Sequence, residues 1–163
     1  MTNKTEDDKK PATVSTRIDK ALADLESADE NVRAEAAILL HEQSHPGALE
    51  ACLKTLNDAP DQLHLDRTPA VRCLVEIGME ALEPLLDRLA AGDRMTRLHA
   101  QRAIEGITKR QFGFDGTTWA PGALDRWLAW WEQIAFDYDA EAAARAEGLA
   151  RLRSWHREEA LHR

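Results

Sequence analysis

The sequence of 163 residues predicts an all-α protein, a short α–α superhelix or solenoid with a capping helix at its C-terminal end. First, one nine-residue pattern recurs without a gap at 17–25, 48–56, 81–89 and 123–131. Its apolar positions have the i, i+3, i+4, i+7 spacing of a helix face. Second, another recurring helix lies between the copies. Helix pairs of this length bury their apolar faces only by stacking on neighbours, which predicts a solenoid.

The chain divides into three parts. Residues 1–15 mix Lys, Asp, Glu and Thr without periodicity, which predicts a disordered N-terminal tail. Residues 16–135 hold the repeats and form the predicted helical domain. Residues 136–163 follow a helical pattern with a thin, Ala-rich apolar stripe, so we expect an amphipathic C-terminal helix. This helix either covers the final repeat or presents Trp155 to another protein.

The helix between the copies has its own signature. It begins as Asp29 followed by Arg33, returns as Asp93 followed by Arg97, and has a middle version around Arg67. Small alanines follow each arginine at the expected helix crossing. We interpret the arginines as partners of neighbouring acids that join one repeat to the next.

These two signatures together resemble HEAT repeats. Asp-x-x-x-Arg opens one helix, a small Ala follows, and Ala-Leu-x-x-Leu-Leu-x-x-Leu forms the next helix, over roughly 17–134. The resemblance implies the α-solenoid architecture, which belongs to the wider class of armadillo-like helical folds. It does not imply one activity, because such arrays carry many functions.

Two inserts interrupt the array. The first, 59–64, lengthens one connection. The second, 109–122, reads KRQFGFDGTTWAPG and is followed at once by a helix with three tryptophans. Phe-Gly-Phe-Asp followed by Trp and a Trp-Trp pair resembles the terminal module of many bacterial HEAT-like proteins. This resemblance identifies a type of terminus and no ligand.

The tryptophans of the last copy differ in their expected environment. Trp127 and Trp131 replace core leucines of earlier copies, so they should cap the open end of the solenoid. Trp130 replaces polar residues. We expect the insert to cover it, through Phe112, Phe114 or Trp119; if it is exposed, it is a binding hot spot. The candidate binding residues are therefore Trp130, Trp119, Phe114 and Trp155.

Cys52 and Cys73 both fall on the inward faces of the repeats. We interpret them as reduced packing residues and not as a disulfide or a metal pair.

The formal net charge of −8 disfavours nonspecific nucleic-acid binding. A basic group could still form a surface, although pairing with nearby acids is the preferred interpretation; it comprises Arg88, Arg94, Arg97, Arg102, Lys109 and Arg110. Position 3 of each copy is acidic: Asp19, Glu50, Glu83 and Asp125. These acids either complement helix dipoles, which we favour, or line a groove for a basic peptide.

One motif points to catalysis. His41 to His45 reads HExxH, the spacing that places two imidazoles on one zinc ion in metallopeptidases. Pro46 disfavours a helix at His45, and the repeat register places the motif in a turn. No third ligand motif follows it.

We therefore expect a noncatalytic scaffold or adaptor whose partner is a protein or peptide. The alternative is a zinc-dependent hydrolase that uses 41–45. The sequence predicts no cofactor, metal site, small-molecule substrate or membrane segment. The lack of a signal-like start predicts a cytoplasmic protein, and the Ala, Arg and Trp usage suggests a bacterial source.

Overall fold

The computed structural model describes residues 11–134 and 137–162, which form eight α-helices and one short 3₁₀ helix. In order they are α1 (Val14–Asp24), α2 (Glu30–Glu42), α3 (Ala48–Lys54), α4 (Pro69–Ile77), η1 (Gly78–Ala81), α5 (Leu82–Ala91), α6 (Arg94–Phe112), α7 (Ala123–Ile134) and α8 (Ala142–Leu161). The predicted all-α fold is confirmed.

Four of these helices begin at a capping side chain. Thr13, Asp29, Thr68 and Asp93 precede α1, α2, α4 and α6, and each accepts a hydrogen bond from a backbone N–H in the first turn. Such caps satisfy donors that a helix start leaves free. The Asp residues of the repeat signature therefore set where two of the helices begin.

The boundaries differ in detail from the predicted ones. Helix α1 begins at Val14 and not after residue 15, because Thr13 caps it. Helix α6 continues through Phe112, so the aromatic connection is 113–122 and not 109–122. Gly113 ends α6 in the left-handed conformation, with φ 116°. The disorder predicted for residues 1–10 lies outside the described residues.

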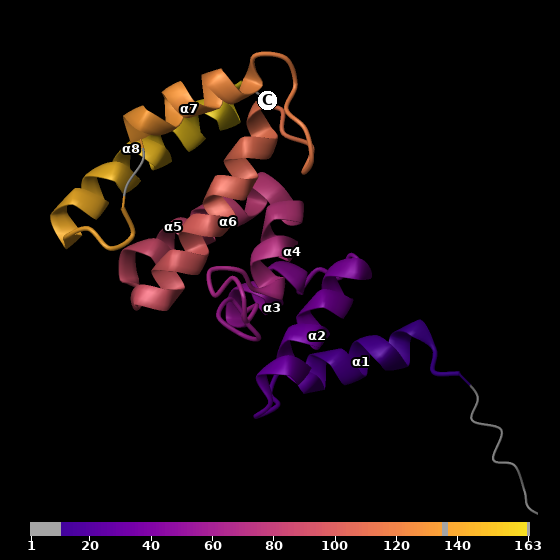
Figure 1. Ribbon diagram of the computed structural model, residues 1–163. Helices are drawn as coiled ribbons and strands as arrows, with labels where there is room; N and C mark the ends of the chain where they lie inside the picture. The colour runs from indigo at the N-terminus through magenta and orange to yellow at the C-terminus, as the bar shows by residue number, and fades with distance from the viewer. Residues whose placement is uncertain (1–10, 135–136, 163) are drawn as a thin grey trace, which may run out of the picture.

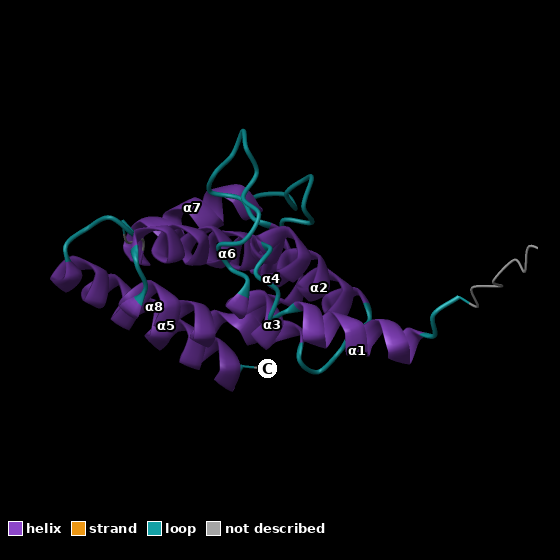
Figure 2. Ribbon diagram, turned by 90° about the horizontal axis from the view of Figure 1, so that it is seen from below, coloured by secondary structure: helices purple, strands orange, loops and turns teal. Residues whose placement is uncertain are grey.

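The helices form two layers (Figures 1 and 2). In Figure 2, α2, α4, α6 and α7 make the upper layer, and α1, α3, α5 and α8 make the lower layer. Helices α2, α4 and α6 pack side by side, and α1, α3 and α5 pack against them from below. This arrangement is the stack of helix pairs that the repeat predicts.

The last helix pair departs from the predicted register. The sequence of α7 matches the copies in α1, α3 and α5, yet α7 packs against α6 in the other layer. Helix α8 takes the place beside α5, where Arg153 Nη2 lies 2.8 Å from Asp87 Oδ1 and His156 Nδ1 lies 3.0 Å from Glu83 Oε1. The C-terminal helix thus completes the lower layer.

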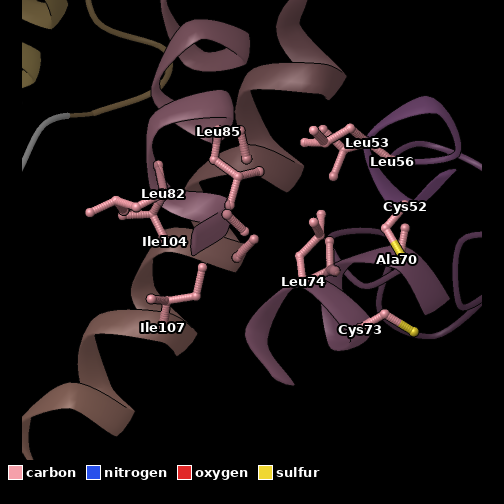
Figure 3. Close-up of a cluster of buried hydrophobic side chains, with 14 of the residues drawn as sticks. Cys52, Leu53, Leu56, Ala70, Cys73, Leu74, Leu82, Leu85, Ile104 and Ile107 are labelled. Atoms are coloured by element: carbon pink, nitrogen blue, oxygen red, sulfur yellow. The ribbon is translucent and has the colours of Figure 1, made fainter. Parts of the chain in front are cut away.

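The core runs between the layers. Leu82 and Leu85 of α5 and Ile104 of α6 are fully buried, and Figure 3 shows them with Leu53 of α3 and Leu74 of α4. Leu149 and Leu152 extend this core from α8. Burial of each large side chain is worth about 1.5 to 3 kcal/mol, so the stacking of neighbouring pairs is the main source of stability.

Arg33 joins two repeats, as the sequence predicts. Its guanidinium contacts both carboxylate oxygens of Asp58 at 2.7 and 2.8 Å and donates to the carbonyl of Ser27. The equivalent Arg97 behaves differently, because it donates to the backbone carbonyls of Gly92 and Tyr138. The arginine signature therefore marks a structural position whose acceptor varies.

Candidate functional site

A hollow of the surface lies between α3 and α5. Two cavities of about 440 and 560 Å³ share Glu50, Leu53, Arg88 and Thr96 in their walls, so together they form one groove. We call it the α3–α5 groove. Its apolar side chains are Leu49, Leu53, Leu56, Pro84 and Ala91.

The charged residues of the groove fall into two classes. Lys54 pairs with Glu26, Asp58 with Arg33, and Asp87 with Arg153. In contrast, Glu50 and Arg88 are exposed and have no ion pair or hydrogen bond of their side chains within the described ranges. The groove therefore offers one acid and one base beside an apolar floor.

Local sequence explains the shape of the groove. Helix α3 is short because Pro46 and Gly47 precede it and its C-terminal cap, Thr55, leads directly into a loop. At the other wall, Gly92 separates α5 from α6. A Cβ at Gly92 would lie 2.4 Å from the carbonyl oxygen of Arg88 and 2.6 Å from Thr96 Cγ2. Only glycine permits this close approach, which holds Thr96 at the edge of the groove.

The four predicted binding residues are all half-buried at the C-terminal end. The Trp130 ring lies 4.6 Å from that of Trp155 and 5.1 Å from that of Phe112, measured between centroids. Phe114 and Trp119 lie 5.0 Å apart, and Trp119 lies 5.8 Å from Trp127. The Trp131 ring, which lies 5.6 Å from that of Trp127 and 5.8 Å from that of Trp130, joins these contacts into one chain of rings.

This arrangement resolves how Trp130 is covered. Of the three aromatic residues expected to cover it, Phe112 does so from the end of α6, whereas Trp119 packs on Trp127 and Phe114 packs on Trp119. Trp155 of α8 also packs on Trp130, a contact that the sequence pattern does not indicate. Trp127 is buried, and its indole N–H donates to Thr108 Oγ1 at 3.2 Å.

The outer face of α7 remains apolar and exposed. Leu124 and Leu128 are 41% and 44% exposed, although both belong to the stripe that the repeat pattern predicts as core. The reason is the place of α7 at the end of the upper layer, where no further helix among the described residues stacks on it.

The basic group does not form a continuous free surface. Arg94 binds Asp139, Arg102 binds Asp66 and Glu105, and the Lys109 ammonium lies 4.9 Å from the centroid of Trp127. The Arg102 hydrogen bond also holds the pKa of Asp66 below its usual value. These pairings agree with the interpretation that most of this group is structural.

The HExxH segment does not form a zinc site of the peptidase type. Helix α2 ends at Glu42, and Ser44 has a positive φ of 50°, so His45 lies beyond the helix. His41 Nε2 lies 2.8 Å from Glu76 Oε2, while His45 Nδ1 accepts from the N–H of Gly47 at 3.0 Å. Within residues 11–134 and 137–162 no three His, Cys, Asp or Glu residues gather as metal ligands.

The sequence did not indicate the structural role of the buried residue His99. His99 is 1% exposed, its Nε2 donates to the carbonyl of Leu65 at 2.9 Å, and its Nδ1 lies 2.7 Å from Asn57 Oδ1. It fixes the connection between α3 and α4, which borders the groove at Asn57. A single histidine in a helix gives no sequence signal for such a role.

Comparisons with known proteins identify the repeats. The family model described as HEAT repeats matches residues 18–105, which is more than half of the chain. No curated protein and no solved structure matches the chain. No helix of the described residues has the length and apolar character needed to cross a membrane.

Proposed function

This chain belongs to the HEAT-repeat family, and we propose that it is a noncatalytic adaptor that binds a peptide segment of another protein in the α3–α5 groove. Stacked repeats create extended surfaces of this kind, and proteins of this architecture use them for recognition.

The observation that carries the proposal is the composition of the groove. Its volume lies in the range of about 300 to 1,000 Å³ that is usual for binding sites, and its floor is apolar. Glu50 and Arg88 supply a free acceptor and a free donor at its wall. An extended peptide could place an apolar side chain on the floor of the groove, donate a hydrogen bond to Glu50 and accept one from Arg88.

The aromatic residues of the C-terminal end favour a structural role for that end, which leaves the groove as the binding site. Trp130, Trp119, Phe114 and Trp155 cover one another, which favours closure of the solenoid over the role of a binding hot spot. We propose that this end is the bacterial-type terminal module and that the adaptor acts in the cytoplasm. The zinc-hydrolase alternative has less support, because His41 and His45 have separate structural partners.

The first prediction tests the groove. Peptides selected on the wild-type protein from a random linear library should bind so that NMR shifts change around Leu49, Glu50 and Arg88. The double variant Glu50→Ala, Arg88→Ala should bind these peptides about tenfold more weakly or worse, because both polar anchors are lost. Titration calorimetry measures the affinity.

The matched control is Asp125→Ala with Arg126→Ala, which removes one exposed acid and one exposed base from α7. It should keep the wild-type affinity. If only this control lost affinity, the peptide would bind at the aromatic C-terminal end and not in the α3–α5 groove. Failure to select any peptide, with folded protein confirmed by circular dichroism, would contradict the proposal.

A further inference from the structure

Helix α7 exposes two apolar positions that are buried in the interior of the array. Leu82 and Leu86 of α5 occupy the second and sixth positions of the nine-residue pattern, and both are fully buried. The same positions of α7 hold Leu124 and Leu128, which are 41% and 44% exposed. The C-terminal end of the array therefore presents an apolar surface that a further repeat would cover.

The opposite end of the array has an open groove. A cavity of about 280 Å³ lies between α1 and α2, and its apolar side chains are Ala21, Val32, Ala36 and Leu39. We call it the α1–α2 groove. Both ribbon views place α1 and α7 at opposite ends of the molecule (Figures 1 and 2).

The equivalent surface of α6 is covered by the preceding repeat. In the repeat register, Val32 and Glu35 of α2 correspond to Thr96 and His99 of α6. Both side chains of α6 form a hydrogen bond with Asn57, which follows α3. Within the described part of the chain, no repeat covers the matching surface of α2. The α1–α2 groove thus has the position in which an array receives its preceding repeat.

The charges of the two ends are complementary. Asp125 and Glu132 are exposed within one helical turn of the exposed leucines of α7. The α1 wall of the groove carries the exposed Arg17, and the α2 wall carries Glu35. None of these four side chains forms an ion pair or hydrogen bond within residues 11–134 and 137–162. The acids of α7 therefore fit the α1 wall, and Glu35 repels them from the α2 wall.

We propose that the protein associates head to tail with a second copy of itself. Leu124 and Leu128 of one copy pack into the α1–α2 groove of the next copy, and Arg17 there pairs with Asp125 and Glu132. Each copy keeps one free end, so the contact is heterologous and extends the stack of repeats. The proposal does not depend on peptide binding in the α3–α5 groove.

The second prediction tests this association on the full chain. In sedimentation equilibrium between about 10 µM and about 1 mM, the mean mass of the wild type should rise steadily, without a plateau at the dimer. Leu161→Glu, at a leucine of α8 that is 84% exposed, is the matched control and should associate like the wild type.

Two blocked chains test the direction of the contact. Leu124→Glu with Leu128→Glu blocks the α7 end, and Arg17→Glu with Val32→Glu blocks the groove. Circular dichroism confirms that each chain is folded. Each should stay monomeric alone, because its one intact end has no complement. A mixture of the two should form a one-to-one dimer and nothing larger.

Charge reversal gives a second test with exposed residues only. Arg17→Glu alone should weaken association at least about tenfold, because the acids of α7 lose their partner. Adding Asp125→Lys and Glu132→Lys to the same chain should restore association, since the signs are then exchanged.

Four outcomes would overturn the proposal. The wild type stays at the mass of one chain up to about 1 mM, or its mass levels off at a dimer. One blocked chain alone associates as strongly as the wild type, which indicates a symmetric contact of its intact end. The two blocked chains, both folded, fail to pair. Because the first two outcomes are measured on the wild type, the test remains decisive if a variant unfolds.

Discussion

At the scale of single residues, buried polar side chains hold the irregular parts of the chain. His99 is the main example, because it reaches from α6 to two points of the α3–α4 connection. That connection exposes Leu63 and Leu65 by 87% and 60%, so it gains little from apolar burial. Its order therefore depends on hydrogen bonds, including the one from Asn57 to Thr96 Oγ1 at 2.8 Å.

The third prediction concerns this histidine. His99→Leu keeps an apolar body but removes the imidazole that contacts the Leu65 carbonyl and Asn57 Oδ1. We expect the free energy of unfolding to fall by about 2 to 4 kcal/mol, as measured by urea denaturation.

Hydrogen exchange should accelerate at residues 57–66 in the same variant. The matched change His64→Leu, at a half-exposed histidine of the connection, should stay within about 0.5 kcal/mol of wild type. Equal effects of the two changes would contradict the role of His99.

At the scale of elements, α8 is a structural helix of the solenoid. Leu149 and Leu152 enter the common core, Trp155 faces Trp130, and Arg153 and His156 contact acids of α5. One face of α8 therefore packs on the solenoid and the other faces away from it, although small and charged residues alternate along its sequence. This contact pattern explains why α8 docks beside α5.

The fourth prediction compares two leucines of α8. Leu152 is fully buried and Leu161 is 84% exposed. Leu152→Ala should lower the free energy of unfolding by about 2 to 5 kcal/mol through lost burial and an added cavity, whereas Leu161→Ala should change it by less than about 0.5 kcal/mol. Chemical denaturation measures both. Similar losses in the two variants would show that α8 docks in another register.

At the scale of the whole molecule, the two ends of the solenoid differ from its centre. Helix α1 buries only Ala21, whereas α6 buries eight residues, including Ile104 and Ile107. Exposed apolar side chains gather at both ends, with Val14 and Leu22 on α1 and Leu124 and Leu128 on α7. Stability should therefore decrease from the centre toward α1.

The fifth prediction is a gradient of hydrogen exchange. In a repeat protein each unit is stabilised mainly by its neighbours, so end units open more readily. Amides of α1 should exchange at least about tenfold faster than those of α6, as followed by mass spectrometry. Uniform protection from α1 to α6 would show that the array unfolds only as one unit.

The sequence predicted the repeated helices better than their placement. The stripes of 17–25, 48–56 and 81–89 correctly marked α1, α3 and α5, because apolar spacing and capping residues act within a few positions. The same stripe in α7 did not predict that this helix packs against α6 in the upper layer. Any helix that is half-buried shows that spacing, whichever neighbour covers it, so Leu124 and Leu128 were expected in the core and are exposed.

The candidate site depended almost entirely on the tertiary structure. The sequence by itself determined the helices, their inward faces and the family of the repeat, since these follow from local spacing. The path of the chain decided which distant residues meet: Glu50 and Arg88 in one groove, and Trp130 with Trp155. Such contacts depend on how whole helices stack. The local sequence pattern does not determine which residues far apart in the sequence come together.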